Sequence, residues 1–192
     1  YTWRHDSVLI TLQDPLTAHI DVHNKAPPSV AAKKILFVSS ARKMDKKRSK
    51  VKLSPVSLLG SAPDWKLQID FTTSPTPFPA HICATDQRPD IVLYSDSTRT
   101  VILIELTCPA EENIADARFR KTIKYTELKD QIVDCGWSCH LKTIEVGVRG
   151  LVSASVPRAL RSLGFSNAAS RDLSRKVSLA CARCSLAIYQ CH

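Results

Sequence analysis

Residues 88–112 read RPDIVLYSDSTRTVILIELTCPAEE and decide the fold class, because two short apolar runs flank a turn. The runs, 91–94 and 101–106, have the composition of central strands that are covered on both faces, and the second is rich in β-branched residues. The segment SDSTR at 95–99 is typical of a hairpin turn. We therefore predict two neighbouring strands at the centre of a sheet.

The segments on either side extend this to an α/β pattern. Residues 65–71 (WKLQIDF) alternate apolar and polar side chains, as a half-buried strand does. Residues 112–134 carry an apolar stripe at helical spacing, and Gly136 follows as a helix stop signal. A further strand is expected to end near Gly150.

Helices are expected at both ends of the chain. Residues 3–12 have an apolar face at helical spacing, and Pro15 predicts a break after them. Near the C-terminus, Ser155 is the predicted N-cap of a short helix, and residues 167–189 form the last one.

The resulting order, α-β-β-β-α-β-α-α, predicts an α/β fold with a small mixed sheet flanked by helices. We expect a core domain at 1–150 and a C-terminal helical extension at 151–192 packed on it. With 192 residues, 44% of them hydrophobic, the chain is long enough for one core. It starts at Tyr1 and not at Met, so we expect a processed chain or a fragment.

The charge balance favours an anionic partner. The net charge is +9, from 27 Lys and Arg against 18 Asp and Glu, which fits nucleic acid first and an anionic membrane second. No apolar run approaches the roughly 18 residues of a membrane span, and no secretory leader is visible. We therefore expect an intracellular chain with no membrane partner.

Seven of the basic residues lie within 42–52, where Asp45 is the single acid. Because like charges repel, we expect a solvated loop or arm there. Phosphate contacts, a nuclear localisation signal and a plain solubilising loop are the open alternatives. The basic residues are Arg42, Lys43, Lys46, Lys47, Arg48, Lys50 and Lys52.

The chain has seven cysteines, an odd number that favours reduced thiols over a disulfide framework. Cys181 and Cys184 form a CxxC motif, but they lie on an apolar helical stripe with Cys191. That is the pattern of buried cysteines in a helix interface, so we expect no zinc site.

Two carboxylates occupy positions where a buried strand is not expected to carry charge. Asp90 opens the first central strand, and Glu105 lies near the end of the second. A buried carboxylate is costly unless it is paired, protonated or bound to a metal ion. Two of them on neighbouring strands can share a divalent cation, because Mg²⁺ favours one or two carboxylates with water and a phosphate oxygen.

Two lysines of the 112–134 helix are candidates for the same site. Lys121 occupies the apolar stripe, and Lys124 lies at its edge three residues later. The helix should pack back across the sheet and bring one or both amines towards Asp90 and Glu105. A lysine beside metal-bound water and a phosphate can stabilise developing negative charge.

Each of these residues also has a purely structural interpretation. Asp90 would start a turn, Glu105 would form a buried ion pair with a core-facing lysine, and Lys121 would extend its ammonium to the surface. Their order and spacing together favour the site.

Four segments carry a resemblance to a known family: WRHDSVL (3–9), RPDIVL (88–93), IELTCPAEENI (104–114) and KTIKY (121–125). With the αβββαβ order, they make the chain similar to the restriction-like endonuclease domain of site-specific non-LTR retrotransposons, within the PD-(D/E)xK superfamily. The resemblance covers most of 1–150. It implies a restriction-endonuclease-like core that follows a reverse transcriptase and a CCHC zinc knuckle in the full-length protein.

The resemblance also implies roles for individual residues. Asp90 and Glu105 match the family's two acidic ligands, and Lys121 and Lys124 match lysines displaced onto the following helix. Mg²⁺ or Mn²⁺ would be held by the two acids, the Leu106 carbonyl and water.

Two further positions matter for this hypothesis. His5 and Asp6 match a basic-His-acid signature in the first helix, with an auxiliary role. The usual superfamily lysine, two residues after the second acid, is replaced here by Thr107. Catalysis therefore depends on whether a helical lysine reaches the metal.

The predicted function is nicking of target DNA by a metal-dependent endonuclease, which provides a primer for reverse transcription. The basic residues of 42–52, with Arg118 and Arg120, would hold the DNA backbone without reading sequence. DNA in the nucleus is the expected partner, and RNA of the parent element is a second. Two alternatives remain open: a catalytically inactive nucleic-acid-binding module with the same fold, and an RNA- or structure-specific nuclease.

Overall fold

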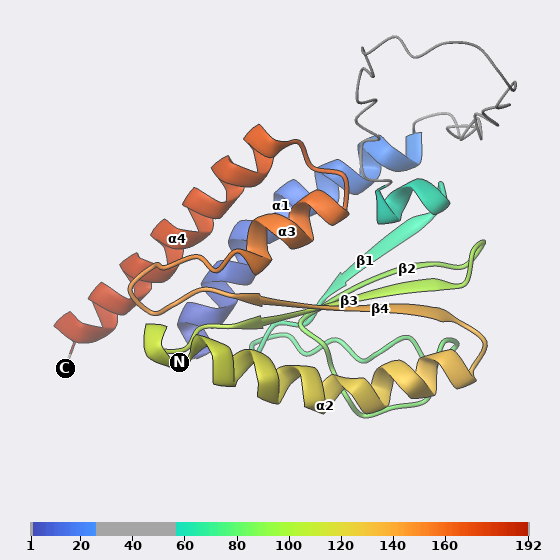
Figure 1. The fold of residues 1–192 in the computed structure, drawn as a ribbon, viewed down its shortest axis with the longest axis horizontal. Coiled ribbons are helices and arrows are strands. Elements are labelled where there is room, and N and C mark those ends of the chain that lie inside the picture. Colours follow the sequence, from blue (N-terminus) through green and yellow to red (C-terminus); the bar gives the residue numbers. More distant parts are fainter. Residues whose placement is uncertain (1, 26–56, 192) are drawn as a thin grey trace, which may run out of the picture.

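The computed structural model describes residues 2–25 and 57–191, which form a four-stranded mixed sheet with helices on both faces (Figure 1). The predicted fold class and element order are confirmed. The predicted basic segment 42–52 lies outside the described residues. In chain order the elements are α1 (Thr2–Lys25), β1 (Trp65–Ile69), β2 (Ile91–Ser95), β3 (Thr100–Thr107), α2 (Ile114–Asp134), β4 (Ser138–Glu145), α3 (Ser155–Ser162) and α4 (Asn167–Gln190), with 3-10 turns at Leu58–Ser61 and Glu111–Asn113.

The strands lie in sequence order, β1-β2-β3-β4. The first three pair antiparallel, with β2 and β3 joined by the predicted turn at 96–99. β4 pairs parallel with β3, so the chain must cross over the sheet between them, and α2 is that crossover. The C-terminal ends of β3 and β4 therefore lie beside the N-terminal end of β2, at one end of the strands.

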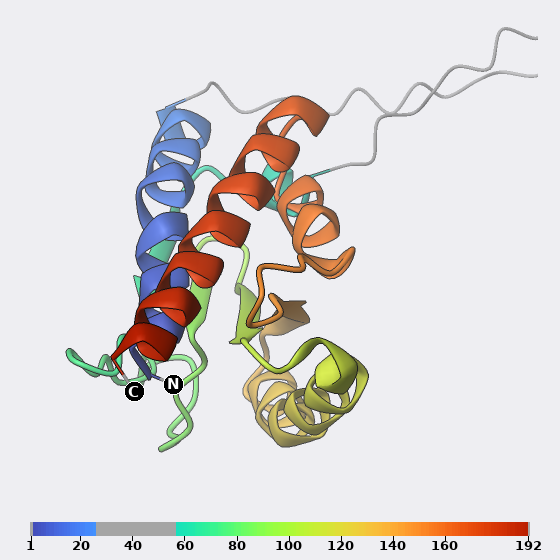
Figure 2. The ribbon, with the colours of Figure 1, turned by 90° about the vertical axis from the view of Figure 1, so that its left-hand side faces the viewer.

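The helices divide into two layers. α1, α3 and α4 cover one face, and α2 alone covers the other (Figure 2). The side chains of β3 alternate accordingly: Ile102, Ile104 and Leu106 join the cluster under α1, whereas Val101 and Leu103 pack against α2. Every residue of β2 and β3 is buried, as the apolar runs predict.

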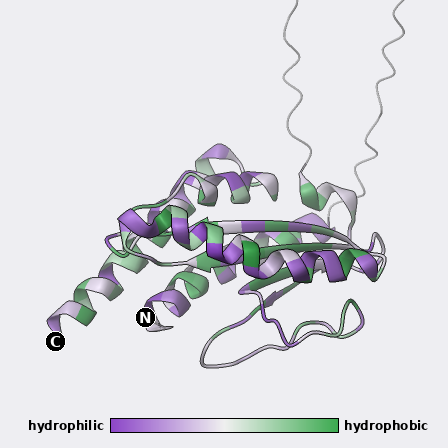
Figure 3. Cartoon of the chain, turned by 60° about the horizontal axis from the view of Figure 1, so that its bottom comes forward, coloured by the Kyte–Doolittle hydropathy of each residue, from purple (hydrophilic) through white to green (hydrophobic). Residues whose placement is uncertain are grey.

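Hydrophilic and hydrophobic residues alternate along α2 (Figure 3), and one apolar stripe of the helix is buried. The buried residues of that stripe are Ala117, Tyr125, Leu128 and Ile132. Lys121 lies on the same stripe and is only partly exposed. Within the ranges that the structure describes, no helix is both long and apolar enough to cross a membrane.

The predicted break at Pro15 is wrong, because α1 continues through it to Lys25. Proline removes one backbone hydrogen bond and favours a kink in a helix interior. Here the buried residues Leu12, Leu16 and Ile20 continue one apolar face across Pro15. Tertiary packing of that face outweighs the local cost.

Two expectations near the C-terminus need correction. The last strand ends at Glu145 and not near Gly150, and an isolated bridge between Val146 and Val152 follows it. Ser155 is the first helical residue of α3 and makes no N-cap hydrogen bond. Its hydroxyl donates instead to a carboxylate oxygen of Glu145, at 2.6 Å.

Candidate active site

Asp90 and Glu105 lie together where the hydrogen-bonded ladder between the central strands β2 and β3 ends. The last pair of that ladder is Ile91 with Ile104, so the next residue on each strand is one of the two acids. The backbone N–H of Asp90 donates to Glu105 Oε2 at 3.2 Å, and the N–H of Leu106 donates to Asp90 Oδ2 at 2.7 Å. The predicted proximity of the two acids is therefore present.

Both carboxylates are buried, with 8% of Asp90 and 1% of Glu105 exposed. Burial and the negative charge of Asp90 raise the pKa of Glu105 to about 7, and the nearby Lys121 ammonium offsets only part of this rise. Burial and the second acid thus disfavour the charged form of Glu105, and a cation bound between the two carboxyl groups would favour it again.

Of the two predicted lysines, Lys121 reaches an acid directly. Its ammonium donates to Glu105 Oε1 from the α2 side of the sheet. Lys124 lies one step around the helix, and its ammonium donates to the Tyr125 hydroxyl at 3.2 Å. The helical lysines thus occupy the neighbourhood that the sequence predicted, with Lys121 in contact and Lys124 at the margin.

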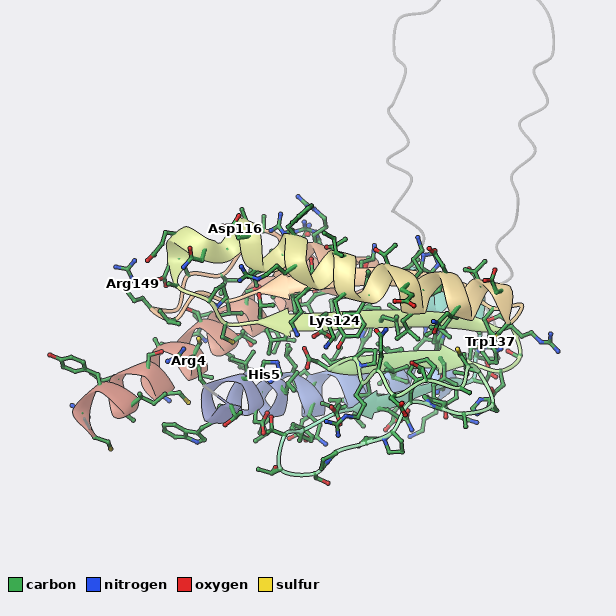
Figure 4. The ribbon with its side chains drawn as sticks, turned by 90° about the horizontal axis from the view of Figure 1, so that it is seen from below. Arg4, His5, Asp116, Lys124, Trp137 and Arg149 are labelled. Atoms are coloured by element: carbon green, nitrogen blue, oxygen red, sulfur yellow. The ribbon has the colours of Figure 1, made fainter. Side chains whose placement is uncertain are left out.

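The auxiliary pair on α1 also belongs to this site. His5 Nε2 lies 3.3 Å from Asp90 Oδ2, and its Nδ1 lies 3.4 Å from Asp6 Oδ1. Burial lowers the pKa of His5, but the carboxylates of Asp90 and Asp6 outweigh it and hold that pKa above its usual range. Figure 4 shows His5 on α1 and Lys124 on α2 relative to the strands.

The direction of the Leu106 carbonyl follows from the backbone hydrogen bonds at the end of β3. Within an extended strand the N–H and C=O of one residue point to the same side. The Leu106 N–H points to Asp90, and the carbonyl of the next residue, Thr107, accepts from Val146 on the opposite side. The Leu106 carbonyl is therefore directed to the Asp90 side of β3.

The two predicted DNA-binding arginines of α2 differ in their surroundings. Arg120 is exposed. The Arg118 guanidinium instead forms a bidentate ion pair with Glu145, in which Nε donates to Oε1 at 3.0 Å and Nη2 to Oε2 at 2.7 Å. Its Nη2 also donates to the Ser153 hydroxyl at 2.9 Å. DNA contact by either arginine stays a prediction.

The sequence pattern does not predict one residue beside the acids. Tyr125 lies on the apolar stripe of the helix, yet its hydroxyl donates to the Arg88 carbonyl, two residues before Asp90. A tyrosine on a buried helical stripe is the signal, because its hydroxyl needs a partner there. Thr107, which replaces the usual lysine, is buried, and its hydroxyl oxygen has no hydrogen-bond partner within the described structure.

A divalent metal ion is chemically compatible with this donor set. Among residues 2–25 and 57–191, no group of three or more His, Cys, Asp or Glu side chains is arranged to hold a metal ion. Mg²⁺ does not require such a cage, because it commonly binds one or two carboxylates and keeps several waters. The carboxyl groups of Asp90 and Glu105, with the adjacent Leu106 carbonyl, fit that pattern.

No protein-family model matches the chain, and no curated protein matches it. Among solved structures, the chain is similar to one titled "Structure and function of toscana virus cap snatching endonucleases". The two are 22% identical in sequence, with a TM-score of 0.34. The similarity covers 52% of this chain and 50% of the viral chain, so this chain spans about half the length of that neighbour.

Proposed function

We propose that this chain is a divalent-metal-dependent endonuclease that hydrolyses phosphodiester bonds of DNA. The observation that carries the proposal is the buried pair Asp90–Glu105 with the Lys121 ammonium on Glu105. Burial and the neighbouring Asp90 raise the pKa of Glu105 to about 7, although the Lys121 ammonium contacts it.

The chain's own residues have distinct roles in this proposal. Asp90, Glu105 and the Leu106 carbonyl would hold Mg²⁺ or Mn²⁺, and the bound ion would supply Lewis-acid chemistry that polarises the phosphate and lowers the pKa of its water. Lys121 or Lys124 supplies a positive charge beside the scissile phosphate, where it stabilises the charge that develops in the transition state. His5 balances the charge of Asp90 from the α1 side.

The finer parts of the proposal rest on the sequence resemblance. They are a parent non-LTR retrotransposon, nicking of a target site in the nucleus, and backbone contacts from 42–52, Arg118 and Arg120. A catalytically inactive nucleic-acid-binding module is the alternative outcome of the same experiment.

The test is nicking of supercoiled plasmid by the purified chain with Mg²⁺, with Mn²⁺ and with a chelator. We expect metal-dependent nicking that Asp90→Asn and Glu105→Gln abolish. Glu112→Gln is the matched control, because Glu112 is an exposed acid close to the same edge. DNA binding without nicking by the wild type, unaffected by metal or by Glu105→Gln, would replace the nuclease with the binding module.

A further inference from the structure

We propose that Tyr125 is a positioning residue of this site: its buried hydroxyl ties α2 to the segment that carries Asp90 and holds the amine of Lys124 in place. The inference rests on the proposed nuclease function and adds a residue on which that function depends.

The hydroxyl of Tyr125 bridges two elements. Only 1% of the residue is exposed, and its O–H donates to the Arg88 carbonyl at 3.0 Å. The same oxygen accepts a hydrogen bond from the Lys124 ammonium at 3.2 Å. One atom therefore links a lysine of α2 to the loop that leads into β2.

The link to Arg88 matters because Asp90 follows after only one residue, Pro89. The proline ring fixes the φ angle of that residue, which removes one of the backbone rotations between the Arg88 carbonyl and Asp90. Holding the Arg88 carbonyl therefore restricts where the Asp90 carboxylate can lie. α2, through Tyr125, sets the position of an acid that belongs to a different element.

The ammonium groups of Lys121 and Lys124 both lie over the ring of Tyr125. The Lys124 ammonium lies 4.8 Å and the Lys121 ammonium 5.9 Å from the ring centroid, within the range of cation–π attraction. A phenylalanine would retain this ring and its place in the buried apolar cluster to which Leu128 and Leu103 also belong. Only the hydroxyl distinguishes a positioning role from a packing role.

The hydroxyl is a permanent donor in this environment. Burial and the negative charges of Glu105 and Asp90 raise the pKa of Tyr125 well above its usual value. The phenol therefore stays protonated at any pH at which the protein would work. The positioning role rests on the hydrogen bonds of the Tyr125 hydroxyl to Arg88 and Lys124, and it requires no proton transfer by the phenol.

The direct test is Tyr125→Phe, with Tyr94→Phe as the matched control. Tyr94 belongs to the same apolar cluster on β2, but its ring contacts Lys66 and His81 and not the acids. We expect Tyr125→Phe to lower kcat for plasmid nicking by about 10- to 100-fold, with KM for DNA nearly unchanged, since small misplacements cost this much. Tyr94→Phe should change neither parameter.

A double-mutant comparison separates positioning from general destabilisation. Lys124→Met should lower kcat by a similar factor without touching the core, because Lys124 is exposed. In the Lys124→Met background, Tyr125→Phe should then have a clearly smaller effect than in the wild type. Full additivity of the two effects would overturn the part of the inference that concerns Lys124.

A readout in metal-free protein separates this inference from the nuclease proposal. Acetic anhydride labelling, followed by mass spectrometry, measures how accessible the Lys124 amine is. Tyr125→Phe should raise its labelling rate several-fold relative to Tyr94→Phe. If the wild type does not nick DNA but this change appears, the nuclease fails and the positioning stands. Equal labelling rates and equal kcat in both variants would overturn the positioning role.

Discussion

Two buried glutamates on neighbouring parallel strands have very different hydrogen-bond and ion-pair partners. Glu105 on β3 and Glu145 on β4 both face α2, and each meets a basic residue of that helix, Lys121 or Arg118. Glu145, fully buried, receives two guanidinium hydrogen bonds and a third from Ser155. Glu105 receives one ammonium and one backbone N–H, and it lies beside a second acid.

The pKa values follow these surroundings. Burial raises the pKa of Glu145, but the hydrogen bonds from Arg118 and Ser155 outweigh it and hold that pKa below its usual range. At Glu105, burial and Asp90 outweigh Lys121, and the pKa rises to about 7. The same helix thus completes one ion pair for stability and leaves the other short of positive charge. The difference teaches that two similar acid–base contacts can leave their acids in opposite electrostatic states, depending on the other groups that surround each carboxyl.

Lys121→Met should have the largest effect on activity, and it tests the difference between the ion pairs of Glu105 and Glu145. We expect nicking to fall by roughly 100- to 1000-fold, the scale on which one preorganised group at a reacting centre acts. The free energy of unfolding should change little, because the Glu105 carboxyl can take up a proton when its cation is removed. Lys129→Met is the control, since Lys129 lies on the same helix beside Leu141 and Thr143 of β4. A large loss of stability with intact nicking would reverse the roles assigned to the two pairs.

Next comes Arg118→Met, where stability should dominate. Removing the guanidinium leaves Glu145 buried without its main partner, and we expect a loss of about 3 kcal/mol in unfolding free energy. Urea denaturation followed by circular dichroism measures it, beside Arg120→Met as the exposed control. Unchanged stability with weaker DNA binding would contradict the structural role and support the DNA contact predicted from sequence.

The smallest expected effect is the pH dependence of Glu145→Gln. A carboxyl whose pKa is lower in the folded state stabilises the fold above its unfolded pKa and loses that contribution as pH falls through the folded value. The stability difference between wild type and variant should be constant from neutral pH down to about 4.5 and shrink below it. Unfolding measured on both sides of that pH, with Glu112→Gln as the control, checks the sign. A difference that grows in acid would mean that Glu145 is not stabilised as the anion.

The sequence predicts the acids and the helix better than it predicts their partners. Asp90 and Glu105 are visible because apolar runs isolate them, and Lys121 is visible because it interrupts an apolar stripe. Glu145 alternates with Ile144 and Val146, which is typical of a solvent-facing position on a half-buried strand. Its burial depends on α2 and α3 packing over it, and local patterns do not record that.

The errors near Pro15 and Ser155 have the same cause. Each residue has a strong local preference, for a helix break and for an N-cap. The long apolar face of α1 outweighs the first preference, and the hydrogen bond to Glu145 outweighs the second. Boundaries set by local chemistry were therefore less predictable than the order of elements, which follows from the periodicity of the apolar residues.

The bidentate ion pair between Arg118 and Glu145 also limits where insertions and deletions can occur in α2. It fixes the rotation of α2 about its own axis, and Lys121 follows three residues later on the same helix. Each residue inserted into a helix turns everything after it by about 100°. A single insertion or deletion between these two positions would swing the Lys121 amine away from Glu105 while the ion pair at Arg118 held fast. Length changes should therefore be tolerated in the loops around α2 and excluded from this one turn.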